Sequence, residues 1–171
     1  SLGLSGVGLS DVQVETLVHA LIDVGKTKRP GDRPPPLRIL DVSRNKVASR
    51  GGIAFGKLLE LPTHACGLAE LDLSWNYLRG EGANRIGAAL DGDENLKRLN
   101  LAFNTFGKSG ALALGRALET NDCLEWLDLT QNGVDGAATI VLAYGLSINE
   151  ALEHLILDGN PVGEAGARAM L

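Results

Sequence analysis

Two short segments of this sequence come closest to a motif that does chemistry. Gly25-Lys26-Thr27 and Gly107-Lys108-Ser109 match the last three positions of a phosphate-binding loop. The complete motif also needs a glycine five residues before the glycine that precedes lysine. Ala20 and Ala102 occupy those positions. We therefore predict that neither segment binds a nucleotide.

The remaining reactive side chains do not form a recognisable site. His19, His64 and His154 are far apart in the sequence, and no Cys or His pair has metal-ligand spacing. No serine or cysteine is accompanied by a base that would make it a nucleophile. The sequence therefore predicts no catalytic residue, no metal site, no cofactor and no small-molecule substrate. On this basis the protein is not an enzyme.

One phrase, Leu-x-x-Leu-x-Leu-x-x-Asn, organises the rest of the chain. It occupies residues 37–45 (with Val42 at the third apolar position), 68–76, 96–104, 124–132 and 152–160. Successive asparagines lie 31, 28, 28 and 28 residues apart. Self-similarity at such a period is typical of a solenoid built from repeated supersecondary units.

Each repeat contains two kinds of apolar spacing. Leu99 and Leu101 alternate with Asn100 and Ala102, which predicts a strand with one buried face. Residues 106–118 then have apolar spacings of three and four, which predict a helix. Small residues recur at one position of each predicted helix, where we expect a close approach to the strand layer: Gly51, Gly82, Gly110, Ala138 and Gly166.

The geometry of such repeats predicts a curved molecule. A strand, a helix and a parallel strand form a right-handed unit. Parallel strands stack about 4.8 Å apart, whereas helix axes need roughly 8–10 Å. The array must therefore bend, with strands on the concave face and helices on the convex face. We expect the stacked asparagines Asn45, Asn76, Asn104, Asn132 and Asn160 to bond buried backbone groups of neighbouring coils.

The phrase and its period resemble the leucine-rich repeat family, and the length of the repeat resembles its ribonuclease-inhibitor-like class. The resemblance implies an α/β fold: a right-handed β-α solenoid in the form of a horseshoe arc, with a parallel concave sheet and convex helices. Members of that family are mostly protein-interaction scaffolds. They include ribonuclease inhibitors, immune receptors, actin regulators, ciliary proteins and a Ran GTPase activator.

Residues 1–171 are expected to form one leucine-rich repeat domain of about six coils. The first repeat is degenerate, and both ends interrupt a repeat, so we expect a fragment of a longer protein. Residues 25–36 form an insertion rich in proline and charge, for which we expect an exposed loop. Arg33 and the three following prolines fit a polyproline-type ligand, and the alternative is an insertion without function.

Composition narrows the classes of partner and compartment. The chain has 16 basic and 21 acidic residues, without the basic excess typical of nucleic-acid binding. It has no apolar run long enough to cross a membrane. Cys66 and Cys123 precede strands two coils apart, about 10 Å, which is too far for a disulfide. We therefore expect reduced thiols and a cytoplasmic protein, with the cytoskeleton or cilium as further possibilities.

The predicted concave face carries unusual aromatic residues. Trp75, Phe103 and Trp126 fall in columns that should face solvent, where large aromatics often mark binding sites. We predict a protein-binding surface made of Trp75, Phe103, Trp126, Asp72, Asp128, Glu70 and Arg98. Its acids would suit a partner with a basic rim. The alternative is that Trp75 and Phe103 pack on each other and only cover the strand edge.

Two functions follow from these expectations. The first is a non-enzymatic scaffold that binds a partner protein on the concave face. The second is a GTPase-activating protein resembling the Ran GTPase activator, although no motif of that activator occurs in this sequence.

Overall fold

The computed structural model describes residues 1–32, 37–63 and 65–171. The polyproline-type ligand expected at Arg33 and the following prolines lies outside the described residues, as does His64.

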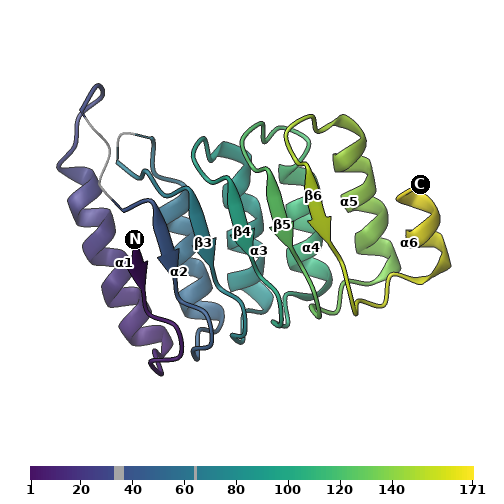
Figure 1. Ribbon diagram of the computed structural model, residues 1–171, viewed down its shortest axis with the longest axis horizontal. Helices are drawn as coiled ribbons and strands as arrows, with labels where there is room; N and C mark the ends of the chain where they lie inside the picture. The colour runs from purple at the N-terminus through teal and green to yellow at the C-terminus, as the bar shows by residue number, and fades with distance from the viewer. Residues whose placement is uncertain (33–36, 64) are drawn as a thin grey trace.

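Within these described residues, six short strands alternate with six helices (Figure 1). The strands are β1 (Leu2–Gly3), β2 (Ile39–Asp41), β3 (Glu70–Asp72), β4 (Arg98–Asn100), β5 (Trp126–Asp128) and β6 (His154–Ile156). The helices are α1 (Asp11–Lys26), α2 (Ser49–Leu59), α3 (Gly80–Ala89) with a 3₁₀ turn η1 (Leu90–Gly92), α4 (Gly107–Ala117), α5 (Gly136–Ile148) and α6 (Gly163–Ala169).

The strands form one parallel sheet in chain order, and the helices make a second layer behind it (Figure 1). Strand pairing follows the repeat, since Leu71 lies opposite Leu99 and Leu99 lies opposite Leu127. The described residues therefore form the predicted β-α solenoid, with the sheet on its concave side.

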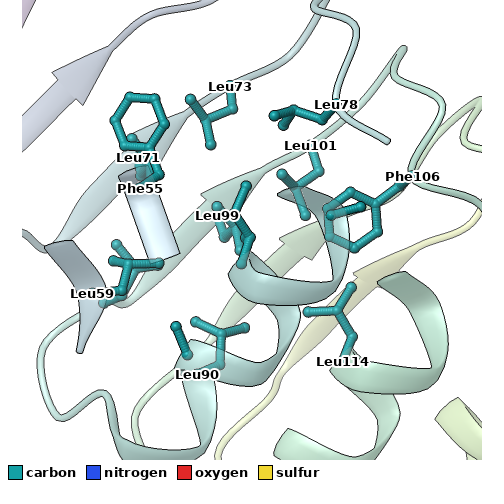
Figure 2. Close-up of a cluster of buried hydrophobic side chains, with 14 of the residues drawn as sticks. Phe55, Leu59, Leu71, Leu73, Leu78, Leu90, Leu99, Leu101, Phe106 and Leu114 are labelled. Atoms are coloured by element: carbon teal, nitrogen blue, oxygen red, sulfur yellow. The ribbon is translucent and has the colours of Figure 1, made fainter. Parts of the chain in front are cut away.

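A continuous apolar core lies between the two layers (Figure 2). Leu99 and Leu101 point from the sheet toward Phe106 and Leu114, and all four side chains are buried. Each coil adds an equivalent set, so the core extends along the whole stack. This arrangement explains why one repeated phrase is sufficient to specify the fold.

The asparagine ladder is confirmed. Asn104 Nδ2 donates to the carbonyls of Leu101 in its own coil and Leu73 in the preceding coil, both at 2.9 Å. Its Oδ1 accepts from the backbone N–H of Leu78, also in the preceding coil, at 2.9 Å. The other asparagines of the ladder also bond their own and the preceding coil. Each coil therefore depends on the asparagine of the next one for its buried backbone groups.

A second ladder connects the helices back to the strands, and the sequence analysis did not anticipate it. Asp93, Asn121 and Asn149 are spaced 28 residues apart. Asn121 Oδ1 accepts from the N–H of Leu124 at 2.8 Å, and its Nδ2 donates to the carbonyl of Leu90 at 2.7 Å. Asn149 makes the equivalent bonds one coil later. Asn121 and Asn149 therefore join neighbouring coils at the start of the strands, as the asparagine ladder does at their end, whereas the Asp93 side chain bonds only its own coil.

Gly82 and Gly166 face the neighbouring helix, so their predicted approach to the strand layer was wrong. Gly51 and Gly110 lie closest to the core side chains of Val47 and Phe106 in their own coils. A Cβ on Gly82 would lie 2.4 Å from the backbone oxygen of Ser49 in α2. A Cβ on Gly166 would lie 2.9 Å from the Cβ of Thr139 in α5. Glycine at this position lets successive helices approach each other near their first turns.

The predicted insertion loop begins later than expected. Helix α1 continues through Lys26, so the first two residues of the 25–36 segment are helical. Gly25 is buried, and a Cβ there would lie 2.6 Å from the backbone oxygen of Ala65. Residues 29–32 are exposed and form a small turn, in which the Asp32 carboxylate accepts from the N–H of Arg29.

No helix within the described residues is long and apolar enough to cross a membrane.

Candidate protein-binding face

The first residues of three strands form one row across the concave sheet. Glu70, Arg98 and Trp126 lie opposite one another in register. The Arg98 guanidinium carbon is 4.4 Å from the centroid of the Trp126 ring, which is cation–π distance. Trp126 is half-buried, whereas Arg98 is exposed. Arg98 therefore covers one face of Trp126 and leaves an amphipathic pair at this edge of the sheet.

The next exposed row contains the predicted acids and is partly structural. Asp72 and Asp128 each accept a hydrogen bond, through Oδ1, from the backbone N–H two residues later, at 2.8 and 2.7 Å. Asn100, between them, does the same at 3.1 Å and also donates to the second oxygen of Asp72 at 3.0 Å. One oxygen of each acid thus stabilises the end of its own strand, and Asn100 holds the second oxygen of Asp72.

These two rows line a shallow hollow of about 260 Å³ over β2 to β5. Glu70, Asp72, Arg98 and Trp126 are among the residues that line it. Its wall combines carboxylates, one guanidinium and an indole ring. Such a surface offers both apolar area and charge to a protein segment.

Trp75 and Phe103 form a separate aromatic pair just beyond the strands. Their ring centroids are 4.0 Å apart and their planes differ by 14°. The rings therefore pack on each other, as the alternative interpretation expected, yet 46% of Trp75 and 38% of Phe103 remain exposed. The Arg44 guanidinium lies 5.1 Å from the centroid of the Trp75 ring. The aromatics of the concave face thus form two clusters, one at each end of the strands.

The backbone at this second cluster adopts an uncommon conformation. Arg44, Trp75, Phe103 and Gln131 all have φ between 54° and 56°, in the left-handed region that favours glycine. At the equivalent position of the last coil stands Gly159. Trp75 and Phe103 thus occupy turn positions where a side chain carries a conformational cost of about 1 kcal/mol.

Tyr77 is a neighbour of this pair that the sequence analysis missed. It lies directly after the ladder residue Asn76, and 59% of its side chain is exposed. Its backbone N–H donates to the carbonyl of Val47 in the preceding coil at 2.8 Å. The sequence analysis compared only the columns before the asparagine, so the exposed column that follows it was not considered.

The described residues offer little for metal or nucleophilic chemistry. Within them, no group of three His, Cys, Asp or Glu side chains is placed to hold a metal ion. Cys66 and Cys123 are free and buried, and burial raises the pKa of both thiols. A raised thiol pKa keeps the sulfur protonated and weakly nucleophilic. Burial also raises the pKa of Asp93, against the opposing effect of two backbone N–H donors.

Comparison with known proteins agrees with this architecture. A family profile described as "Leucine Rich repeat" matches residues 33–56 and 92–115. Among solved structures, the chain is similar to "Leiomodin-1 Actin-Binding Site 2 (ABS2)", with a TM-score of 0.68 and 22% identity. That match covers 88% of this chain and 83% of the other. No curated protein sequence matches this chain. The chain carries leucine-rich repeats and has the fold of a leucine-rich repeat protein. Its assignment to the ribonuclease-inhibitor-like class remains a prediction.

Proposed function

We propose that this chain is a non-enzymatic interaction scaffold that binds a partner protein on its concave face. The observation that carries the proposal is the pair of partly exposed aromatic clusters, Trp126 with Arg98 and Trp75 with Phe103, on either side of an acidic row. Tryptophan and arginine are enriched among residues that dominate binding energy. The carboxylates of Asp72 and Asp128 would favour lysine or arginine at the rim of the partner.

The structural neighbour supports the same class of function. It is an actin-binding site of leiomodin-1. An actin-associated partner and a cytoplasmic or cytoskeletal location are therefore part of this proposal. Co-sedimentation with filamentous actin is a direct test of that choice of partner.

Binding should be tested with matched aromatic substitutions. Partners recovered from a lysate by the immobilised protein are identified, and the dissociation constant of the strongest is then measured. Trp75→Ala and Trp126→Ala should each weaken binding by about 2 kcal/mol, or roughly thirtyfold. Tyr144→Ala is the control, because Tyr144 is 59% exposed on helix α5, outside the concave face. Equal losses for all three variants, or a loss for Tyr144→Ala alone, would refute a concave site.

A GTPase activator is the second candidate. It follows only from the resemblance of the repeat phrase to a family that includes the Ran GTPase activator, and no catalytic motif supports it. GTP turnover by a panel of small GTPases, with and without this protein, separates the two functions. An increase in the rate of GTP turnover that persists in the Trp75→Ala and Trp126→Ala variants would favour the activator.

A further inference from the structure

The turns that leave the sheet carry positive charge as well as aromatic side chains. We define the turn patch as Arg44, Lys46, Trp75, Tyr77, Arg79 and Phe103, all of which are exposed. Arg44 and Lys46 flank the ladder residue Asn45, and Arg79 stands immediately before helix α3. Lys46 and Arg79 lie outside the predicted concave site. The turn patch therefore differs in charge from the acidic row on the strands.

Backbone hydrogen bonds hold the turns of this patch in register. The N–H of Arg44 donates to the carbonyl of Ser74 at 2.9 Å, and the N–H of Trp75 donates to Ala102 at 2.8 Å. Arg44, Trp75 and Phe103 consequently form one column across three coils, and Lys46 and Tyr77 form the column beside it. Equivalent positions on neighbouring coils lie about 4.8 Å apart. The patch is therefore continuous.

The cations of the patch are not neutralised by the protein itself. Within the described part of the chain, Arg44, Lys46 and Arg79 have no carboxylate within ion-pair distance. The nearest acids along the chain are Asp41, which precedes Arg44 and Lys46, and Glu81, in the first turn of α3 after Arg79. By contrast, Lys108 of the next coil is paired with Asp135 at 3.9 Å. The charge available to a ligand is therefore concentrated on the second and third coils.

The aromatic rings expose their edges in this patch. Phe103 stacks on Trp75, and the guanidinium of Arg44, from the coil on the other side, lies 5.1 Å from the centroid of the Trp75 ring. The edge of an aromatic ring carries partial positive charge, whereas its face is negative. The exposed part of Trp75 therefore adds to the field of the nearby cations. Because Phe103 already stacks on this ring, it is a poor platform for stacked nucleic-acid bases.

We propose that the turn patch binds an acidic segment of a partner protein. Carboxylates of the segment would contact Lys46 and Arg79, and an apolar side chain would lie against the edges of Trp75 and Phe103. This surface extends the proposed function, with which it shares Trp75 and Phe103. It predicts a partner with one acidic segment in addition to the basic rim expected for the concave face.

The test uses a short fluorescein-labelled peptide in which aspartates alternate with leucines, and it measures fluorescence anisotropy. The control peptide has asparagine at every aspartate. At about 0.02 M salt, the Lys46→Gln/Arg79→Gln double variant should bind the acidic peptide roughly five- to tenfold more weakly than the wild type. Salt of about 0.5 M should remove most of this difference, because it screens exposed charges.

Two further variants distinguish the possible causes. Lys57→Gln/Arg116→Gln removes the same charge from exposed positions on helices α2 and α4, and should change binding less than twofold. Trp126→Ala should leave peptide binding unchanged, whereas it should weaken the partner of the concave face. Failure of this inference is thus separable from failure of the proposed function.

Several outcomes would overturn the inference. It fails if the acidic peptide does not bind, or if the asparagine peptide binds equally well. An equal loss in the two double variants would show that only net charge matters. Tight binding of a labelled oligothymidylate, with no binding of the acidic peptide, would assign the patch to nucleic acid instead.

Discussion

The substitution Asn104→Leu tests the asparagine ladder at a buried position in the middle of the stack. Leucine is close to asparagine in size but cannot form the three hydrogen bonds that join Asn104 to Leu73, Leu78 and Leu101. Each bond contributes about 1 kcal/mol net, and its loss leaves a buried backbone group without a partner. We therefore expect the free energy of unfolding to fall by about 3 kcal/mol. For a domain of this size that corresponds to a decrease of roughly 6–12 °C in Tm.

The matched control is Asn160→Leu in the last coil. Asn160 makes the same kinds of bond, but its side chain is only half-buried, so water can replace part of what is lost. We expect a cost of about 1 kcal/mol there. Both variants are compared with the wild type by urea denaturation and by thermal unfolding, and circular dichroism monitors both transitions. An equal loss of unfolding free energy at the two positions would refute the argument from burial. So would an Asn104→Leu protein with the same Tm as the wild type.

Three further predictions concern single positions. Asp93→Asn should stabilise the protein by about 1 kcal/mol at neutral pH. Burial raises the pKa of Asp93, so the folded protein favours the protonated carboxyl, and the wild type loses stability as pH rises through the raised pKa. Urea titrations should therefore show the difference in unfolding free energy between Asp93→Asn and the wild type shrinking in acid. Gly82→Ala should lower the free energy of unfolding by several kcal/mol, because its Cβ would clash with the backbone of Ser49. Gly92→Ala should be nearly neutral, because the space around Gly92 is open. Asp72→Lys should lower Tm and Asp72→Asn should not, since only asparagine preserves the oxygen that accepts the backbone N–H.

The sequence predicted the fold because the ladder and its leucines repeat at a fixed spacing. The second ladder escaped notice because it lies outside the repeated phrase and begins with an aspartate, Asp93, before Asn121 and Asn149. Helix contacts at Gly82 were assigned to the wrong layer, since periodicity gives the buried side of a helix but not the neighbour that covers it. Sequence patterns therefore located the elements better than the contacts between them.

The predicted binding residues were placed correctly in their columns, but their contacts were not foreseen. Sequence spacing put Trp126 on the strand and Trp75 beyond it. It did not show that Arg98 would cover Trp126 or that Asp72 would bond its own turn. Such contacts depend on side-chain rotamers, which a column of residue types does not determine. The basic turn patch was missed for a simpler reason, because the column containing Lys46 and Tyr77 was never compared.

The backward direction of the asparagine bonds has a consequence for synthesis on the ribosome. The turn after β4 exposes the backbone N–H of Phe106 until Asn132, whose Oδ1 accepts from it, has been added. Corresponding asparagines are 28 residues apart in this part of the chain. At ordinary translation rates that interval lasts on the order of 1–6 s. We therefore expect the nascent chain to become protease-resistant in steps of one repeat, each step delayed until the following coil has emerged.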